Sequence, residues 1–301
     1  MSAEKPLAWM HRPEGGGRLA LWFIRTLALR MGRAPARLLL VPVAAYYVLR
    51  RGPERRASRR FLSRALGRPA TLIDVWRHMF TFATVTLDRI FLLTEEFRRF
   101  DIRTIGLEEV YAQLDFSHGA LFIGAHLGSF DALRVLALQM PERSVRPVID
   151  LAQNPTVSLL LNALNPAIAR SIINARQDGT ATALAIHEAL EQRSVVTLLA
   201  DRARPGNALA DAVFLGERAT FPTAPWLLAA ALKVPVVLCF GLYRGGRRYD
   251  LHFEIFAPTL AIPRAARATV VAEIVQRFAD RLSHYAQLAP YNWFNFYDLW
   301  D

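Results

Sequence analysis

The stretch GALFIGAHLGSFDALRVLALQ, residues 119–139, joins two kinds of pattern at a histidine. Its first part is a short apolar run beside glycines, which predicts a buried β-strand over 120–125. From residue 129 the apolar residues recur with the period of an amphipathic helix, so we expect a helix over 129–139. A buried strand that passes directly into a helix is the building unit of α/β folds, in which ligands bind at the carboxyl ends of the strands.

The same alternation of β-rich and helical patterns continues towards the C-terminus and predicts an α/β fold. The GGRR turn at 245–248 lies between two β-rich runs, so the last two strands are expected to be antiparallel in a mixed, mostly parallel sheet flanked by helices. The expected strands are 120–125, 144–150, 171–175, 194–200, 234–243 and 249–257. The expected helices are 129–139, 155–164, 180–192, 222–232 and 266–287. Upstream, the pattern of residues 70–98 predicts a helical segment, with Trp76, Phe80, Phe82 and Leu87 expected in the core.

Composition and cysteine usage are those of a folded protein without disulfides. The 301 residues are 53% hydrophobic and 21% charged, which excludes a disordered or fibrous chain. The only cysteine, Cys239, lies in the apolar run VPVVLCF and is expected to be a buried strand residue. No linker or repeat marks a boundary. We therefore expect one catalytic-sized α/β domain over 105–301 and a helical region over 1–104 that either stands apart or is continuous with it.

The formal charge of +11 is confined to the N-terminal third. Residues 1–104 carry 20 basic against 8 acidic side chains, a net +12, whereas residues 105–301 carry 17 against 18, a net −1. The arginines alternate with apolar runs at 19–29 and 38–49, a mixture that predicts an amphipathic, basic helical region on an anionic membrane surface. The alternatives are a solvated basic face and a bias of the genome towards arginine. Nucleic-acid binding is not expected, because no DNA-binding motif is present.

Both apolar runs are shorter than the roughly 20 residues needed to cross a bilayer, and Pro42 would kink a helix in the second. No cleavable signal peptide is recognisable at the N-terminus. We therefore expect a peripheral or monotopic protein on the cytoplasmic side of a membrane.

His126 and Asp131 are the candidate catalytic residues of the strand-to-helix connection. A histidine there can take a proton from a hydroxyl or amine, and a carboxylate five residues later can fix the imidazole tautomer and stabilise its protonated form. Gly124 and Gly128 on either side permit close backbone approach. The structural alternative is a core histidine, with Asp131 favoured by the helix dipole and Ser129 acting as the helix N-cap.

These residues resemble the lysophospholipid acyltransferase superfamily, and within it the branch of the lipid A late acyltransferases. A second stretch, LADRARPGNALADAVFLGERATFPTAPWLLAAALKVPVVLCF at 199–240, resembles later blocks of the same family, so the similarity covers roughly 105–260. The resemblance implies that His126 is the general base and Asp131 its orienting partner. It further implies a substrate-binding set, for which the candidates are Gly128, Ser129, Arg176, Asp201 and Arg202.

The resemblance implies an acyltransferase that takes an acyl group from an acyl-carrier-protein or CoA thioester to a hydroxyl or amine of a lipid-like acceptor. Two departures leave that acceptor open among lipid A, an aminolipid and a polyene or pigment precursor. Phe221, Pro222 and Thr223 stand where glycerolipid enzymes have Pro-Glu-Gly, and Asp298 and Asp301 stand in the aromatic C-terminus where relatives tend to be basic. That C-terminus is expected either near the substrate mouth or membrane, or in the core.

The sequence predicts chemistry without a metal or cofactor. His187 and Glu188 lie on an expected helix without the second histidine that a zinc site requires, and the N-terminal glycines do not form a phosphate loop. The alternative to an enzyme is a non-catalytic membrane-lipid binding or scaffold protein on the same fold.

Overall fold

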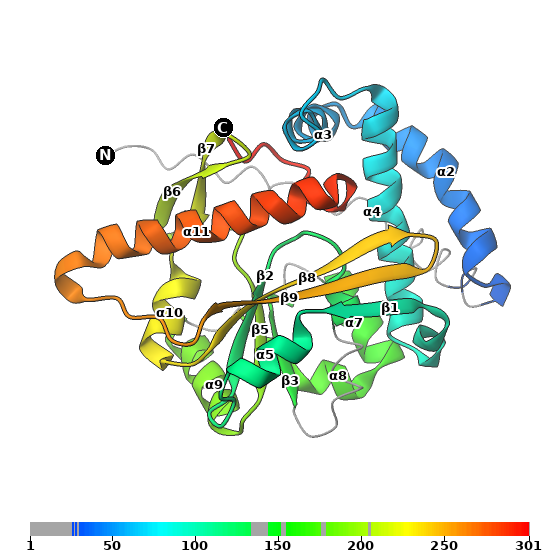
Figure 1. Cartoon of the computed structure of the whole chain (residues 1–301). Coiled ribbons are helices and arrows are strands. Elements are labelled where there is room, and N and C mark those ends of the chain that lie inside the picture. Colours follow the sequence, from blue (N-terminus) through cyan, green and yellow to red (C-terminus); the bar gives the residue numbers. More distant parts are fainter. Residues whose placement is uncertain are drawn as a thin grey trace. The chain divides into compact units, whose positions relative to one another are not determined.

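The computed structural model describes Thr26, Ala28 and residues 30–133, 144–151, 155–175, 179–203 and 206–300. These residues form two compact units, shown within Figure 1. Unit 1 contains the described residues up to Leu87, Asp201–Ala224, and those from Val271 onward. Unit 2 contains Asp88–Ala200 and Pro225–Val270. The expectation that 1–104 forms a separate membrane-associating region stays a prediction.

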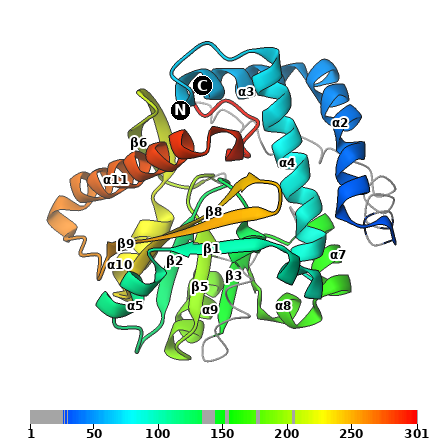
Figure 2. The ribbon, with the colours of Figure 1, turned by 45° about the vertical axis from the view of Figure 1, so that its right-hand side comes forward.

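Unit 2 is built on a seven-stranded mixed sheet in the order β1-β9-β8-β2-β5-β3-β4. Strands β2, β8, β5, β3 and β4 are parallel, β9 is antiparallel to β8, and β1 is parallel to β9. The long β8–β9 hairpin stands out in Figure 2. The strands are β1 (Asp101–Ile105), β2 (Ala120–Gly124), β3 (Val145–Ile149), β4 (Ile173–Asn174), β5 (Val195–Leu199), β8 (Val236–Gly245) and β9 (Arg248–Ala257). The expected α/β class with a mostly parallel sheet is thereby confirmed.

All six strands expected from the sequence are present, although β4 has only two residues. β1 was not expected, because its residues DIRTI are mostly exposed and lack the apolar run of the central strands. It lies at the edge of the sheet, beside β9, where charged side chains are common. Cys239 is buried in β8 as expected, and burial raises the pKa of its thiol to about 12.

Helices cover the sheet of unit 2 at several strands. α5 contacts β9, α8 contacts β3, and α9 contacts both β5 and β4. Together with strand residues such as Leu121 and Ile123, which have no exposed surface, these helices enclose the apolar core. The bounds are α5 (Leu107–Gln113), α7 (Pro155–Leu164), α8 (Pro166–Ser171), α9 (Gly179–Glu191) and α10 (Ala224–Leu232), with short 3-10 turns η1 (Glu95–Arg99) and η2 (Arg264–Ala266). Of the helix expected over 129–139, residues 129–133 are described, and residues 130–133 are helical.

Unit 1 combines helices with a β-hairpin. Its elements are α2 (Arg33–Arg50), α3 (Gly52–Ala65), α4 (Leu72–Leu92), β6 (Leu209–Phe214), β7 (Glu217–Pro222), α11 (Arg267–Leu288) and η3 (Pro290–Asn292). The part of α4 after Leu87 and the part of α11 before Val271 belong to unit 2. α2 continues across Pro42. The apolar run at 19–29 lies outside the described residues apart from Thr26 and Ala28.

The aromatic C-terminal segment forms part of the core of unit 1. Trp293 stacks on Phe61 of α3 with ring centroids 5.5 Å apart and lies 5.3 Å from Phe214 of β6. Trp300 stacks on Phe214 with ring centroids 5.8 Å apart. The structure therefore agrees with the core alternative for this segment, because Trp293 is almost completely buried.

The expected core of α4 is correct in part. Leu87 is buried, but Phe82 is 42% exposed, so its assignment to the core was wrong. Phe82 lies seven residues after Val75 and therefore on the same side of α4 as the buried Val75, His78 and Met79. Its position on this face does not bury it. Phe82 contacts the ring of Phe296 at the surface of the C-terminal segment, with centroids 5.2 Å apart.

Several arginines of the basic region form internal ion pairs in unit 1. Arg60 pairs with Asp298 at 2.6 Å and with Glu217 at 2.9 Å, and Arg64 also pairs with Glu217. Asp298, an acidic departure from the resembled family, thus has an intramolecular partner. These α3 arginines therefore bind acidic side chains within the unit itself.

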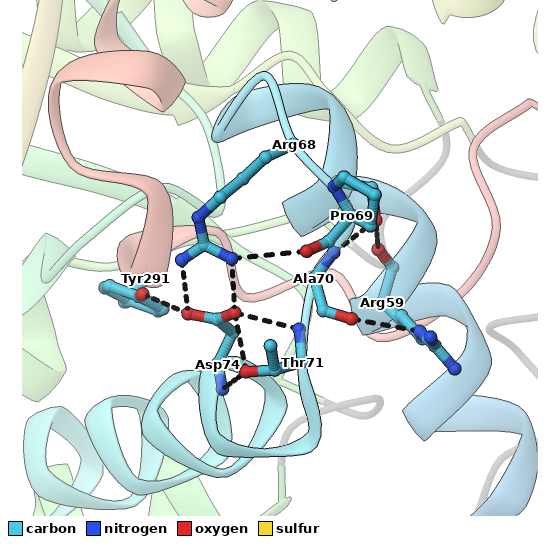
Figure 3. Close-up of polar contacts among 8 residues, drawn as sticks. Arg59, Arg68, Pro69, Ala70, Thr71, Asp74 and Tyr291 are labelled. Carbon is cyan, nitrogen blue, oxygen red and sulfur yellow. Dashed lines mark hydrogen bonds and ion pairs between the residues drawn. The ribbon is translucent and has the colours of Figure 1, made fainter.

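A second cluster of polar contacts fixes the beginning of α4 (Figure 3). The buried carboxylate of Asp74 accepts two hydrogen bonds from Arg68, at 2.8 and 3.0 Å, and one from Tyr291 at 2.8 Å. The backbone N–H and hydroxyl of Thr71 donate to it as well, both at 2.8 Å. These donors hold the pKa of Asp74 well below its ordinary value, with the Arg68 hydrogen bonds as the largest cause. The cluster links the loop between α3 and α4 to the first turn of α4 and to the C-terminal segment.

No helix among the described residues is long and apolar enough to cross a membrane.

Candidate active site

His126 lies just beyond the carboxyl end of β2, between the strand and the following helix. β2 occupies the middle of the sheet, with the parallel strands β8 and β5 on its two sides. The strand is fully buried, whereas His126 is half-buried. A polar side chain at this edge of a parallel sheet stands where α/β proteins bind their ligands, which is the location expected from the sequence.

Two glycines bring the loop after His126 against β8. Gly128 has φ +80°, and a Cβ there would lie 2.1 Å from the carbonyl oxygen of Gly241. A Cβ at Gly241 would lie 2.3 Å from the carbonyl oxygen of Ser129. The N–H of Ser129 donates to the Gly241 carbonyl at 2.7 Å, so the two backbones are joined at this point. Any larger side chain at either position would push the loop away from the strand.

Ser129 and Asp131 occupy the first turn of the helix that follows. The Ser129 hydroxyl accepts a hydrogen bond from the N–H of Ala132 at 3.1 Å, which is the N-cap interaction considered in the sequence analysis. Asp131 is buried within the same turn. A negative charge at this place interacts favourably with the helix dipole.

Asp131 also pairs with an arginine from a distant part of the chain. The Nε atom of Arg89, in the last turn of α4, donates to Oδ2 of Asp131 at 2.6 Å. Unit 2 thus brings together His126, Gly128, Ser129, Asp131 and Arg89 around one strand-to-helix connection.

Asp201 and Arg202 follow β5 in the sequence and belong to unit 1. The amide of Asn295 joins them, because its Nδ2 donates to Asp201 at 2.7 Å and its Oδ1 accepts from Arg202 Nε at 2.6 Å. Arg202 also donates to the carbonyl of Phe294 at 3.2 Å. Burial, and secondly the charge of Asp201, raise the pKa of Tyr297 above its ordinary value. The C-terminal segment therefore holds both predicted substrate-binding residues in place.

Arg176, the remaining predicted substrate-binding residue, lies outside the described residues. Within the part of the chain that the structure describes, no group of three or more His, Cys, Asp or Glu side chains is arranged to hold a metal ion.

The sequence analysis missed three residues that contact candidate site residues: Arg89 and Gly241 in unit 2, and Asn295 in unit 1. Gly241 had a local signal, since a glycine within an apolar strand often marks a close approach of another backbone. Arg89 and Asn295 had none, because their partners Asp131 and Asp201 are 42 and 94 residues away along the chain.

The mixed sheet flanked by helices is the fold expected for an acyltransferase of the resembled superfamily. Comparison with protein-family models adds the particular family: the model described as bacterial lipid A biosynthesis acyltransferase matches residues 67–301. The chain belongs to this family, and the membership supports an acyltransferase that uses an acyl donor and a lipid acceptor. The matched range begins before α4 and so extends further than the similarity noted in the sequence. A search of curated proteins found no match.

Proposed function

We propose that this protein is a membrane-associated acyltransferase that moves a fatty or related acyl group from an acyl-carrier-protein or CoA thioester to a hydroxyl or amine of a lipid-like acceptor. The observation that carries the proposal is the position of His126. It stands half-buried at the carboxyl end of the central strand β2, within the residues that match the acyltransferase family.

His126 is proposed as the general base. It removes the proton from the acceptor hydroxyl or amine while the acceptor oxygen or nitrogen attacks the thioester carbonyl carbon. When the tetrahedral intermediate collapses, the carbon–sulfur bond breaks and the imidazolium returns the proton to the leaving thiolate. One histidine thus serves both halves of the transfer.

Asp131 is proposed to orient His126 and to stabilise the imidazolium that forms. Its place in the first turn of the helix supports this role, because the capped turn and the Arg89 ion pair fix the carboxylate. The spacing of five residues from His126 spans a loop that the Gly128–Gly241 contact holds in position.

Backbone N–H groups near the helix start are proposed to stabilise the oxyanion of the tetrahedral intermediate. The structure narrows this proposal, since the N–H of Ser129 donates to Gly241 and that of Ala132 donates to the Ser129 hydroxyl. The oxyanion donors are therefore amides other than these two. Gly128, Ser129, Arg176, Asp201 and Arg202 remain the proposed substrate-binding set.

Association with an anionic membrane surface is proposed to occur through α2. Its buried stripe of Ala36, Leu40, Ala44 and Val48 leaves a second apolar face exposed to solvent. Leu38 and Leu49 on that face are 73% and 75% exposed, and the others are Leu39, Val41, Val43 and Tyr46. Arg30 and Arg50, both exposed, stand near the two ends of the helix and can contact lipid phosphates. We place the protein at the cytoplasmic face of the inner membrane.

The proposal is tested by incubating the purified protein with a total bacterial lipid extract and labelled acyl-carrier protein, in parallel with labelled acyl-CoA. Mass spectrometry of the lipids then identifies any acylated product, with lipid A precursors and aminolipids as separate acceptor arms. We expect a new product from the wild type with one donor and none from His126→Ala. If the wild type binds lipid but makes no product with either donor, while a control acyltransferase does, the non-catalytic lipid-binding alternative replaces the proposal.

A further inference from the structure

We infer that Arg89, 37 residues before His126 in the sequence, is a positioning residue that holds Asp131 in its working orientation. The inference rests on the proposed function, because it assigns Arg89 a role through the His126–Asp131 pair. Nothing in the local sequence around His126 indicates this residue.

The geometry of the contact is that of a strong charged hydrogen bond. Arg89 Nε lies 2.6 Å from Asp131 Oδ2, slightly shorter than the usual distance of about 2.7–2.9 Å for such pairs. The Asp131 side chain is only 5% exposed, whereas that of Arg89 is 27% exposed. A buried carboxylate without a cationic partner is unfavourable, so the ion pair maintains the charge that the imidazolium requires.

The backbone that carries Arg89 is itself fixed within unit 2. The neighbouring Asp88 is fully buried, and its carboxylate accepts a hydrogen bond of 2.8 Å from the Tyr249 hydroxyl of β9. The next residues, Ile90, Phe91 and Leu92, are buried as well. The last turn of α4 is therefore anchored to the sheet, and the guanidinium starts from a defined position.

The same hairpin supports both sides of the Arg89–Asp131 contact. β9 provides Tyr249, which anchors the last turn of α4, and β8 provides Gly241, which anchors the loop leading to Asp131. Because β8 and β9 are paired along their length, the two anchors belong to one rigid element. The hydrogen bond from Arg89 Nε to Oδ2 has a fixed direction and so restricts rotation of the Asp131 carboxylate. This restriction defines the orientation in which the carboxylate can interact with His126.

The inference is tested with a double-mutant cycle on the full-length protein, using the acyl donor and acceptor identified in the transfer assay. The kcat and KM values are measured for wild type, Arg89→Ala, Asp131→Asn and the double variant. We expect Arg89→Ala to lower kcat roughly 10- to 100-fold with KM unchanged within about twofold. In the Asp131→Asn background the same substitution is expected to have almost no further effect on kcat, because its route of action is already lost.

Two further variants separate positioning from folding. Arg103→Ala removes an exposed arginine that pairs with Asp101 in the same unit, and is expected to leave kcat unchanged. Arg89→Lys keeps the charge but lacks the guanidinium geometry, so it is expected to restore part of the kcat lost in Arg89→Ala. If Arg89→Ala does not fold, as judged by thermal unfolding, the cycle is carried out with Arg89→Lys.

The outcomes distinguish the inference from the proposed function. An equal loss of kcat on Arg89 substitution in both backgrounds, or a rise in KM as the main effect, would show that Arg89 acts on the substrate directly and would overturn the inference. Unchanged kcat in folded Arg89 variants, with His126→Ala inactive, would overturn the inference alone. An active His126→Ala would overturn the proposed function first.

Discussion

Two buried aspartates, Asp74 and Asp131, each lie in the first turn of a helix and each pair with an arginine. Asp74 in unit 1 pairs with Arg68, six residues earlier, and its two oxygens also receive bonds from Thr71 and Tyr291. Asp131 in unit 2 pairs with Arg89 from a different helix and follows a half-buried histidine at a strand end. The local rule that places an acid in a first turn is the same in both cases.

The difference lies in what surrounds the two carboxylates. Donors bind both oxygens of Asp74 from the helix cap, the preceding loop and the C-terminal segment, so its role is to connect elements of the fold. Asp131 stands beside a polar residue at the carboxyl edge of a parallel sheet, where ligands bind. A buried first-turn aspartate therefore indicates function only when its neighbours include a group that can react.

The most direct way to sharpen this comparison is the same substitution at both sites. Asp131→Asn is expected to lower kcat roughly 10³-fold, because it removes the charge that stabilises the imidazolium. Asp74→Asn is expected to leave kcat within about twofold but to lower the free energy of unfolding by about 2 kcal/mol through its weakened charged hydrogen bonds. Steady-state kinetics and denaturant unfolding of both variants provide the measurement. Equal kinetic losses would remove the distinction.

The comparison extends to the histidines, and His78 of unit 1 is expected to make stability depend on pH. His78 is fully buried, its Nε2 donates to the Trp293 carbonyl, and its Nδ1 accepts from the Ser58 hydroxyl at 2.8 Å. Burial lowers its pKa from 6.5 to about 4, so the unfolded chain binds a proton more readily than the folded one. The resulting stability is complete above pH 6.5 and is lost as the pH falls to about 4, by about 3 kcal/mol in total.

Denaturant unfolding of wild type and His78→Asn between pH 7 and 4 measures this effect. The slope of the unfolding free energy against pH reports how many more protons the unfolded chain binds than the folded one. In His78→Asn this number is expected to be smaller than in wild type by up to one proton. The Asp74 contribution is lost at lower pH, because its carboxyl is protonated in the unfolded chain only near and below the ordinary value of 3.8. Identical slopes in the two proteins would contradict the role given to His78.

Two glycines with positive φ provide a matched test of the loop that follows His126. Gly67 in unit 1 has φ +65° and no atom within 4 Å of an added Cβ, whereas Gly128 has φ +80° and a backbone oxygen at 2.1 Å. Gly67→Ala is expected to cost about 1 kcal/mol of backbone strain. Gly128→Ala is expected to cost about 2 kcal/mol more and to lower kcat, because the loop must move away from β8. Equal stability losses would show that the Gly128–Gly241 approach is unimportant.

The smallest effect is expected for the exposed apolar face of α2. Leu49→Glu introduces a charge at a residue that is 75% exposed, so it is expected to weaken binding to anionic vesicles roughly tenfold without affecting folding. Leu184→Glu, on the exposed surface of α9, is the control and is expected to leave vesicle binding unchanged. Co-sedimentation with vesicles measures both. An equal loss in the two variants would indicate a general charge effect and not a binding face.

The fold was largely predictable because its central strands are apolar throughout. β2, β5 and β8 follow from largely apolar runs, and β9 follows from the alternation of apolar with polar residues. The β8–β9 turn follows from Gly245 and Gly246. β1 could not be predicted in the same way, because an exposed edge strand carries no burial signal. Phe82 was misplaced because an apolar side chain in phase with a buried helix face can still lie exposed where no other element covers it.

The candidate site was predictable only as far as it is local in sequence. His126, Gly128, Ser129 and Asp131 all fall within one strand-to-helix connection, and the Ser129 cap follows from the helix start. Arg89 could not be inferred, because an arginine in a long helix has no local feature that identifies its partner 42 residues later. Tertiary packing, which the sequence does not display, brings the two together.

The measurement that tests the account most directly is the initial rate of acyl transfer by wild type, His126→Ala and His187→Ala. His187 is the matched control, since it is an exposed histidine on α9 in the same unit. We expect His126→Ala to lose roughly 10³-fold or more of the rate and His187→Ala to stay within about twofold of wild type. A folded His126→Ala that keeps more than about a tenth of the wild-type rate would contradict the assignment of His126 as the general base.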